Sequence, residues 1–245
     1  YRQDSDFWYL TGFPEPEAVM VLLPGREHGE FVLHYQPKVD LRAGVATGVE
    51  ALVRWQPPSG EIVPPNKFVP IMEQMGQIQV LGDFVLSTAC ETCKQIRQMG
   101  LFLPRVAVNL SALQLEDPDL ISKIKHNLEK QDLSPENLEL EITESLFISH
   151  YEEITERITD LQNLGVGIAL DDFGTGYSSL QYLTRYPFSK LKIDKAFVWN
   201  MDSGPKDREI IRAIISLGHT LNIDVLAEGV ENHGHLQALK NMGCD

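Results

Sequence analysis

The clearest signal in the chain is the segment VGIALDDFG at residues 166–174, a short apolar run that ends in two adjacent carboxylates, Asp171 and Asp172. An amphipathic pattern that is typical of a helix, Tyr151–Leu164, precedes it. Short apolar runs that alternate with helical patterns are typical of buried parallel strands in α/β proteins. The segment therefore predicts a strand, Val166–Asp171, with two acidic side chains at its carboxyl end.

The same alternation continues from about residue 104 to the end of the chain, and two further strands are expected upstream. The predicted strands are Phe31–Gln36, Thr47–Arg54, Val106–Asn109, Leu138–Ile142, Val166–Asp171, Lys190–Ile193 and Val225–Glu228. The predicted helices are Asn66–Met75, Val80–Met99, Pro118–Lys130, Tyr151–Leu164, Asp207–Leu221 and His233–Met242. Strand–helix alternation with right-handed crossovers implies a parallel sheet covered by helices. Together with the length, it predicts an α/β fold, a TIM-like (β/α)8 barrel, whose complete form needs roughly 250 residues.

Composition and charge exclude several classes of function. The 245 residues are 43% hydrophobic, which is enough for a sizeable core. There are 21 Lys and Arg residues against 35 Asp and Glu, a formal net charge of −14, which argues against nucleic-acid polymers because these bind basic surfaces. No apolar run approaches the ~20 residues of a membrane span, and no leader pattern is visible, so we expect no membrane segment. Three cysteines make no disulfide framework, and reduced thiols favour a cytoplasmic location.

Polar side chains end most of the predicted strands, and in a parallel barrel those ends open on one face. The residues concerned are Glu50, Asn109, Glu141, Asp171, Asp172, Lys192 and Glu228. Five of them are carboxylates, which would repel one another strongly unless divalent cations neutralised them. Only Lys192 and Arg54 are expected to supply positive charge nearby. Because the set is rich in oxygen and contains no His or Cys, it favours Mg²⁺ or Mn²⁺ over zinc.

Six short motifs occur in an order that resembles the EAL-domain family, bacterial phosphodiesterases that linearise cyclic di-GMP. They are Glu50-Ala-Leu-Val-Arg54-Trp, Asn109-Leu-Ser, Glu141-Ile-Thr-Glu144, Asp171-Asp-Phe-Gly-Thr-Gly-Tyr-Ser-Ser-Leu180, Lys192-Ile-Asp and Ala227-Glu228-Gly-Val-Glu231. The resemblance covers residues 31–245. It implies an EAL-type barrel that hydrolyses cyclic di-GMP to linear pGpG with two Mg²⁺ or Mn²⁺ ions per active site.

The resemblance also implies roles for single residues in metal binding and catalysis. The ligands of the first metal would be Glu50, Asn109, Glu141 and Asp171, and those of the second Asp171, Asp172 and Glu228. Lys192 matches the lysine that holds or activates the nucleophilic water, and Glu228 is also a candidate base. Neighbouring carboxylates favour the charged form of Lys192, so we prefer it as an orienting donor. Two cations ~3.5–4 Å apart can stabilise both the attacking and the leaving oxygen of a phosphodiester displacement.

Three further residues match family positions around the metals. Arg54 matches an arginine that contacts a substrate phosphate, and Glu231 matches an acid on the substrate side. Glu144 matches the glutamate that anchors the loop after Asp171. The resemblance also implies a homodimer formed through the region 172–186.

Both ends of the chain depart from the family pattern. The family normally continues into a final strand and helix, which are expected to be missing here, since the chain stops where the next strand would begin. Residues 1–30, which include Asp6-Phe-Trp-Tyr-Leu-Thr-Gly-Phe13, resemble instead a fragment of the N-terminal domain of aminopeptidase P-type metallopeptidases. That fragment carries none of the peptidase's metal ligands. We therefore expect a foreign-looking segment over 1–30 and one EAL domain over 31–245.

Besides a phosphodiesterase, two other functions stay open. The chain could be a sensor module that binds cyclic di-GMP without hydrolysing it, or an inactive fusion fragment. The complete set of candidate ligands favours hydrolysis, whereas the missing final strand favours the alternatives.

Overall fold

The computed structural model describes residues 29–57, 60–100, 105–144, 146, 151–174, 180–186, 188–202 and 204–245. The expected foreign segment, residues 1–30, therefore lies outside the described residues except for its last two. In the described part, no helix has both the length and the apolar character needed to cross a bilayer.

Seven strands form one sheet in which spatial order follows chain order. They are β1 (Glu30–Asp40), β2 (Val45–Gln56), β3 (Val106–Asn109), β4 (Leu138–Thr143), β5 (Gly167–Phe173), β6 (Lys190–Ile193) and β7 (Asp224–Ala227). The helices are α2 (Pro65–Gln74), α3 (Ile78–Gln98), α4 (Ala112–Leu115), α5 (Leu120–Gln131), α7 (Tyr151–Leu164), α8 (Leu180–Arg185), α9 (Lys195–Asn200), α10 (Pro205–Thr220) and α11 (His233–Met242), with a short 3₁₀ turn, η1 (Pro135–Asn137). These bounds confirm the predicted alternation of strands and helices.

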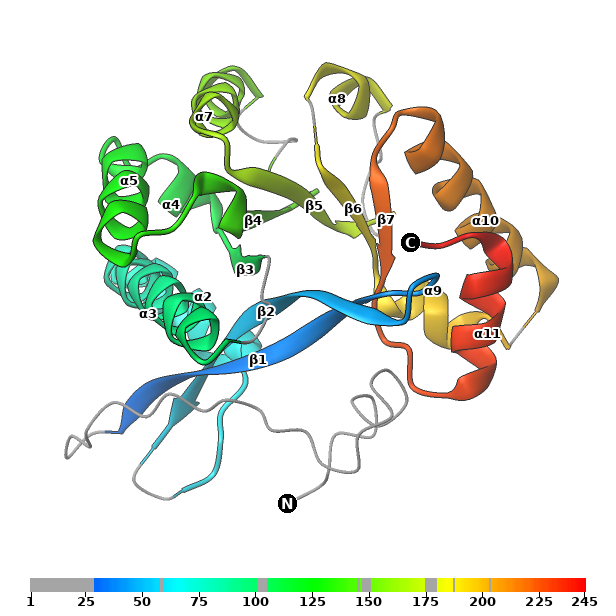
Figure 1. Cartoon of the computed structure of the whole chain (residues 1–245), viewed down its shortest axis with the longest axis horizontal. Coiled ribbons are helices and arrows are strands. Elements are labelled where there is room, and N and C mark those ends of the chain that lie inside the picture. Colours follow the sequence, from blue (N-terminus) through cyan, green and yellow to red (C-terminus); the bar gives the residue numbers. More distant parts are fainter. Residues whose placement is uncertain are drawn as a thin grey trace.

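The sheet curls into an incomplete barrel with helices on its outer side (Figure 1). β1 and β2 form an antiparallel hairpin, and every pair from β2 to β7 is parallel. Asp245 lies between the two edge strands: its backbone N–H donates to the carbonyl of Val225 (3.1 Å), and its carbonyl accepts from the N–H of Leu41 (3.0 Å). The architecture confirms the TIM-like barrel, of which the described residues form seven strands.

Strand β4 is buried on both faces, but the two faces differ sharply in polarity. On β4, Leu138, Leu140 and Ile142 belong to the apolar core. The alternate residues, Glu139 and Glu141, are equally buried and reach lysines of the other strands. Because successive side chains of a strand point to opposite faces, one face of β4 packs against helices and the other fills the barrel with charge. TIM barrels are usually filled by branched apolar residues.

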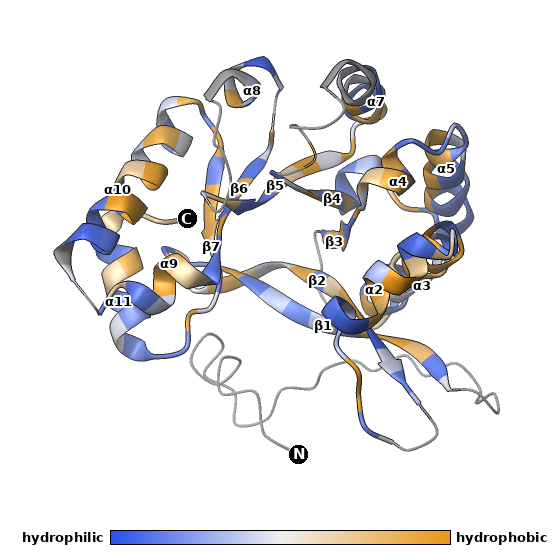
Figure 2. Cartoon of the chain, turned by 180° about the vertical axis from the view of Figure 1, so that it is seen from behind, coloured by the Kyte–Doolittle hydropathy of each residue, from blue (hydrophilic) through white to orange (hydrophobic). Residues whose placement is uncertain are grey.

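The helices cover the apolar outer face of the sheet. Helices such as α5 and α10 carry apolar and polar stripes (Figure 2), which is the pattern of helices packed on a sheet. Ile124 and Leu128 of α5 and Ile211 and Ile215 of α10 are buried in the core. This packing fixes the strands and hence the position of the residues at their carboxyl ends.

Most element bounds lie within two or three residues of the prediction. The differences concern the ends of β1, β2 and β7 and three short helices. β1 and β2 are longer than expected at both ends, because the hairpin pairing continues to the turn at 41–44. The short helices α4, α8 and α9 were not predicted, since four to six residues carry too little periodicity. β7 ends at Ala227, so Glu228 lies just beyond the strand.

Candidate active site

Lys192 is the centre of the candidate site and is completely buried. Its Nζ lies 2.6 Å from Glu141 Oε2, 2.7 Å from Glu228 Oε1, 3.0 Å from Asp171 Oδ2 and 3.2 Å from Glu50 Oε2. One ammonium group is thus surrounded by four carboxylates that come from β2, β4, β5 and the end of β7. The structure brings together the residues that the sequence placed at the strand ends.

The register of the sheet explains why these residues meet. Asn109, the last residue of β3, pairs with Glu141 of β4. Thr143, two residues further along β4, pairs with Asp171 of β5. Asn109 Nδ2 also donates to Glu50 Oε1 at 2.9 Å, so that Glu50 is held between this amide and the central lysine.

Asp171 and Asp172 reach the same site although adjacent residues of a strand normally face opposite sides. The pairing of β5 with β6 is irregular between Leu170 and Phe173, and Asp172 adopts a left-handed backbone with φ of 54°. Aspartate tolerates this conformation better than most residues. The local irregularity therefore places two carboxylates at one strand end.

Three of the carboxylates are spaced for a divalent cation. One oxygen each of Asp171, Asp172 and Glu228 lies within 4.8 Å of the other two. Glu50 and Glu141 place further carboxylate oxygens around Lys192, and Asn109 lies beside Glu50. Carboxylate and amide oxygens without His or Cys are the donor set that Mg²⁺ and Mn²⁺ prefer, so the residues present fit such ions.

Electrostatics shows that the site holds an excess of negative charge. Burial lowers the pKa of Lys192, but the four surrounding carboxylates outweigh burial and hold it well above its ordinary value. Burial, helped by neighbouring carboxylates, raises the pKa of Glu228 to about 7 and that of Asp172 to about 6. Burial also raises the pKa of Glu141. Carboxyl groups with raised pKa values favour the uptake of protons or cations.

The remaining predicted residues lie around this cluster in different ways. Glu144 is buried, and its Oε2 accepts the backbone N–H of Gly174 at 3.0 Å, which ties it to the segment after β5. The guanidinium of Arg54 donates to the carbonyl of Val53 at 2.9 Å and lines the cavity described below. Glu231 is exposed in the segment between β7 and α11, and the structure does not bring it into the lysine cluster. Residues 175–179, which belong to the expected dimer region, lie outside the described residues.

Lys38 and Glu139 were missed by the sequence analysis, which expected positive charge only from Lys192 and Arg54. Lys38 Nζ contacts Glu141 Oε1 and lies 2.6 Å from Glu139 Oε1. Glu139 is fully buried and also accepts from Lys190 (3.1 Å) and Arg105 (3.2 Å). The expectation of only two nearby cations is therefore wrong. A signal was present, because the alternation in Leu138-Glu-Leu-Glu-Ile142 places Glu139 on the same face as Glu141.

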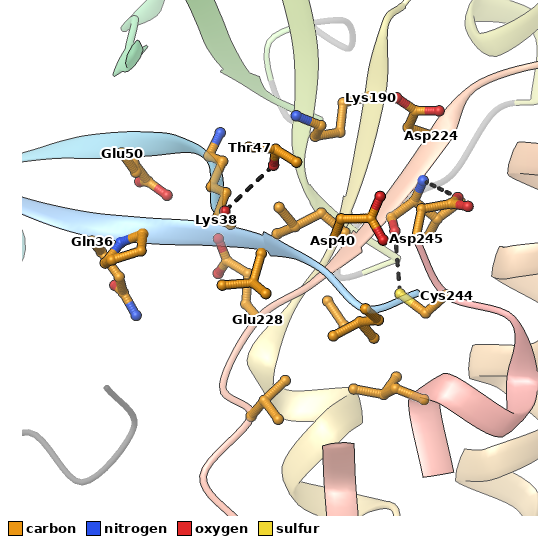
Figure 3. Close-up of a pocket in the computed structure, with 18 of the residues that line it drawn as sticks. Gln36, Lys38, Asp40, Thr47, Glu50, Lys190, Asp224, Glu228, Cys244 and Asp245 are labelled. Carbon is orange, nitrogen blue, oxygen red and sulfur yellow. Dashed lines mark hydrogen bonds between the residues drawn. The ribbon is translucent and has the colours of Figure 1, made fainter. Parts of the chain in front are cut away.

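A cavity of about 930 Å³ opens between β1, β2 and β7 and reaches this charged interior. Figure 3 shows Lys38 on β1, Glu50 on β2 and Glu228 after β7 around it. Arg54 and Trp199 also line the cavity. Two members of the acidic cluster, Glu50 and Glu228, therefore border a cavity that a small ligand can enter.

The fold and the site together define an α/β-barrel domain with an acidic site at the carboxyl ends of its strands. The comparisons with known proteins give the particular family. Residues 20–245 match the EAL domain family, and the chain belongs to it. The family match starts inside the segment that was expected to be foreign, and the comparisons give no support to its resemblance to a peptidase fragment.

The similar proteins include named signalling proteins of bacteria. The chain is 42% identical to the signaling protein YkoW of Bacillus subtilis (strain 168) over 92% of this chain and 28% of that protein. It is also 42% identical to the bifunctional diguanylate cyclase/cyclic di-GMP phosphodiesterase MucR of Pseudomonas aeruginosa, over 89% of this chain and 32% of that protein. The chain therefore spans less than a third of the length of each relative.

Among solved structures, the fold is similar to a PaMucR phosphodiesterase in complex with c-di-GMP. The TM-score is 0.84 with 41% identity, and the match covers 88% of this chain and 87% of that one. The EAL domain of Mycobacterium smegmatis DcpA matches with a TM-score of 0.71 and 32% identity over 91% and 88% of the two chains. These structures confirm the EAL-type barrel.

Proposed function

We propose that this chain is a metal-dependent phosphodiesterase domain that hydrolyses cyclic di-GMP to linear pGpG. The observation that carries the proposal is the convergence of Glu50, Glu141, Asp171 and Glu228 on Lys192, with Asn109 beside Glu50. A non-catalytic relative would be free to lose such ligands, whereas this chain keeps all of those expected within its length. Similarity to the phosphodiesterase MucR supports the same substrate.

Two Mg²⁺ or Mn²⁺ ions would be held by the two ligand groups predicted from the sequence, where they would neutralise the carboxylates and would lower the pKa of a bound water. The surrounding carboxylates keep Lys192 in its charged form, and its proposed role is to orient the attacking water as a hydrogen-bond donor once the cations draw carboxylate oxygens toward themselves. Glu228 lies beside Lys192 and is the candidate base. We call the region around Lys192, at the carboxyl ends of the strands, the mouth of the barrel. Arg54 lines the cavity and contacts a substrate phosphate. Glu231 and Glu144 keep their proposed roles as a substrate-side acid and an anchor of the loop.

The direct test is product analysis by liquid chromatography. The protein is incubated with cyclic di-GMP and either Mg²⁺ or Mn²⁺, and we expect pGpG to form with at least one of them. Glu50→Ala should abolish turnover, because Glu50 contacts both Asn109 and Lys192 at the centre of the site. Tight binding of cyclic di-GMP without pGpG under both metals would contradict hydrolysis and favour the sensor function.

We also propose a homodimer through the region 172–186 and a cytoplasmic location. Light scattering of the purified protein with and without Mg²⁺ tests the first proposal. A monomer at all concentrations in both conditions would contradict it.

A further inference from the structure

The interior of the barrel contains a row of alternating charges that the proposed mechanism does not use. Below the lysine cluster, Glu139 accepts from three cations: Lys38 at 2.6 Å, Lys190 at 3.1 Å and Arg105 at 3.2 Å. Lys38 is the member that also contacts Glu141. The row therefore runs from Glu139 through Lys38 to a proposed metal ligand.

The two oxygens of Glu141 have different partners. Oε1 accepts from Lys38, and Oε2 lies 2.6 Å from Lys192 at the mouth. Glu141 is only 1% exposed, so water does not compete for these positions. Because Lys38 occupies Oε1, the other oxygen of Glu141, Oε2, is directed toward the groups at the mouth of the barrel.

The backbone of β1 prepares Lys38 for this contact. Gln36 pairs with Glu50 and Lys38 with Gly48 in regular register, so the period of two along the strand places the Lys38 side chain on the same face as Glu50. Glu139 then fixes the ammonium from the other side. The Lys38 ammonium is thus held between Glu139 and Glu141, and the side chain is only 7% exposed.

We propose that Lys38, fixed by Glu139, is a positioning residue for Glu141: it occupies Oε1 and so directs Oε2 toward the cations at the mouth. This inference rests on the proposed function, because it concerns the same metal ligands. Partners that orient a metal ligand typically change metal affinity or activity by about 10–100-fold when they are removed.

The test compares Lys38→Met with Lys190→Met. Both variants remove one positive charge from the barrel interior and one partner of Glu139, but only Lys38 touches Glu141. Loss of positive charge alone strengthens cation binding in both variants, whereas loss of positioning weakens it in Lys38→Met alone. The readout is Mn²⁺ binding by titration calorimetry without cyclic di-GMP, and melting temperatures in EDTA report the fold.

We expect Lys38→Met to bind Mn²⁺ about tenfold more weakly than the unmodified protein, and Lys190→Met to bind at least as tightly as the unmodified protein. Lys38→Gln is the second variant, since its amide keeps a donor in the interior where methionine gives none. We expect its Mn²⁺ affinity also to fall below that of Lys190→Met.

Unchanged or tighter Mn²⁺ binding in both Lys38 variants overturns the proposal and leaves Lys38 a structural residue. Because the readout needs no turnover, absence of pGpG from the unmodified protein counts against the proposed function alone. Absence of any Mn²⁺ binding by the unmodified protein overturns both.

Discussion

The barrel interior contains two ionic clusters of opposite composition. At the mouth, one ammonium, Lys192, is shared by four carboxylates. Further inside, one carboxylate, Glu139, is shared by three cations. Lys38 joins the two clusters through Glu141.

The difference is visible in the pKa shifts. Burial raises the pKa of Glu139, but Lys38 and Lys190 outweigh burial and lower it to about 2. At the mouth, by contrast, burial raises the pKa of Glu228 to about 7 despite its contact with Lys192. The inner cluster has more positive than negative groups, whereas the mouth has more carboxylates than cations. This contrast favours the mouth over the inner cluster as the place for the proposed cations.

The largest effect is expected from Lys192→Met. It leaves four carboxylates without their shared partner, and removal of one member of a buried ion pair costs about 3–5 kcal/mol. The free energy of unfolding of the metal-free protein, measured with urea, should fall by that amount, and pGpG formation by about 10²–10³-fold.

The control for this variant is Lys123→Met. Lys123 bridges Asp83 and Asp117 on the protein surface, where ion pairs contribute about 0–1 kcal/mol. Equal losses of stability in the two variants would contradict a special role for the cluster at the mouth.

A smaller loss is expected from Glu139→Gln. The amide keeps one acceptor oxygen, and two of the three cations can turn toward water, because the Lys190 and Arg105 side chains are 13% and 35% exposed. We therefore expect the free energy of unfolding to fall by about 2–3 kcal/mol. A loss larger than that of Lys192→Met, in the same urea experiment, would reverse the order of the two clusters.

Addition of Mg²⁺ or Mn²⁺ should act on the mouth alone. A ligand at 100 times its dissociation constant stabilises a protein by about 2.7 kcal/mol, and we expect a rise of this order in the unmodified protein and in Glu139→Gln. Asp171→Asn should lose most of it, since Asp171 lies in both predicted ligand groups. KCl at equal ionic strength is the control for screening, and an equal rise with KCl would rule out a specific site.

The sequence was sufficient for the mouth but not for the inner cluster. The bounds of β3 and β6 agree with the prediction to the residue, because short apolar runs between helices leave few alternatives. The polar residue at each strand end then indicates which side chains meet. The close approach of both Asp171 and Asp172 required a left-handed residue that no pattern predicts.

Lys38 was missed for a different reason, because the predicted strand ended at Gln36 whereas β1 continues to Asp40. Within β1, Lys38 lies two residues after Gln36, the partner of Glu50, and therefore shares the face of Glu50. Glu139, by contrast, could have been found from its spacing to Glu141. The exposed position of Glu231 depends on the path of the chain after β7, which hydrophobic periodicity does not determine.

The smallest effect is expected from Arg105→Met. Arg105 donates to Glu139 at 3.2 Å and to the carbonyl of Glu136 at 3.1 Å, but more than a third of its side chain is exposed to solvent. Solvent screening limits such an ion pair to about 0–1 kcal/mol, and Glu139 keeps both lysines. Urea unfolding should therefore show a loss below about 1 kcal/mol, with Mn²⁺ affinity unchanged. A loss as large as that of Glu139→Gln would mean that Glu139 needs all three cations. The charge of Lys38 would then serve Glu139 and would not be available to position Glu141.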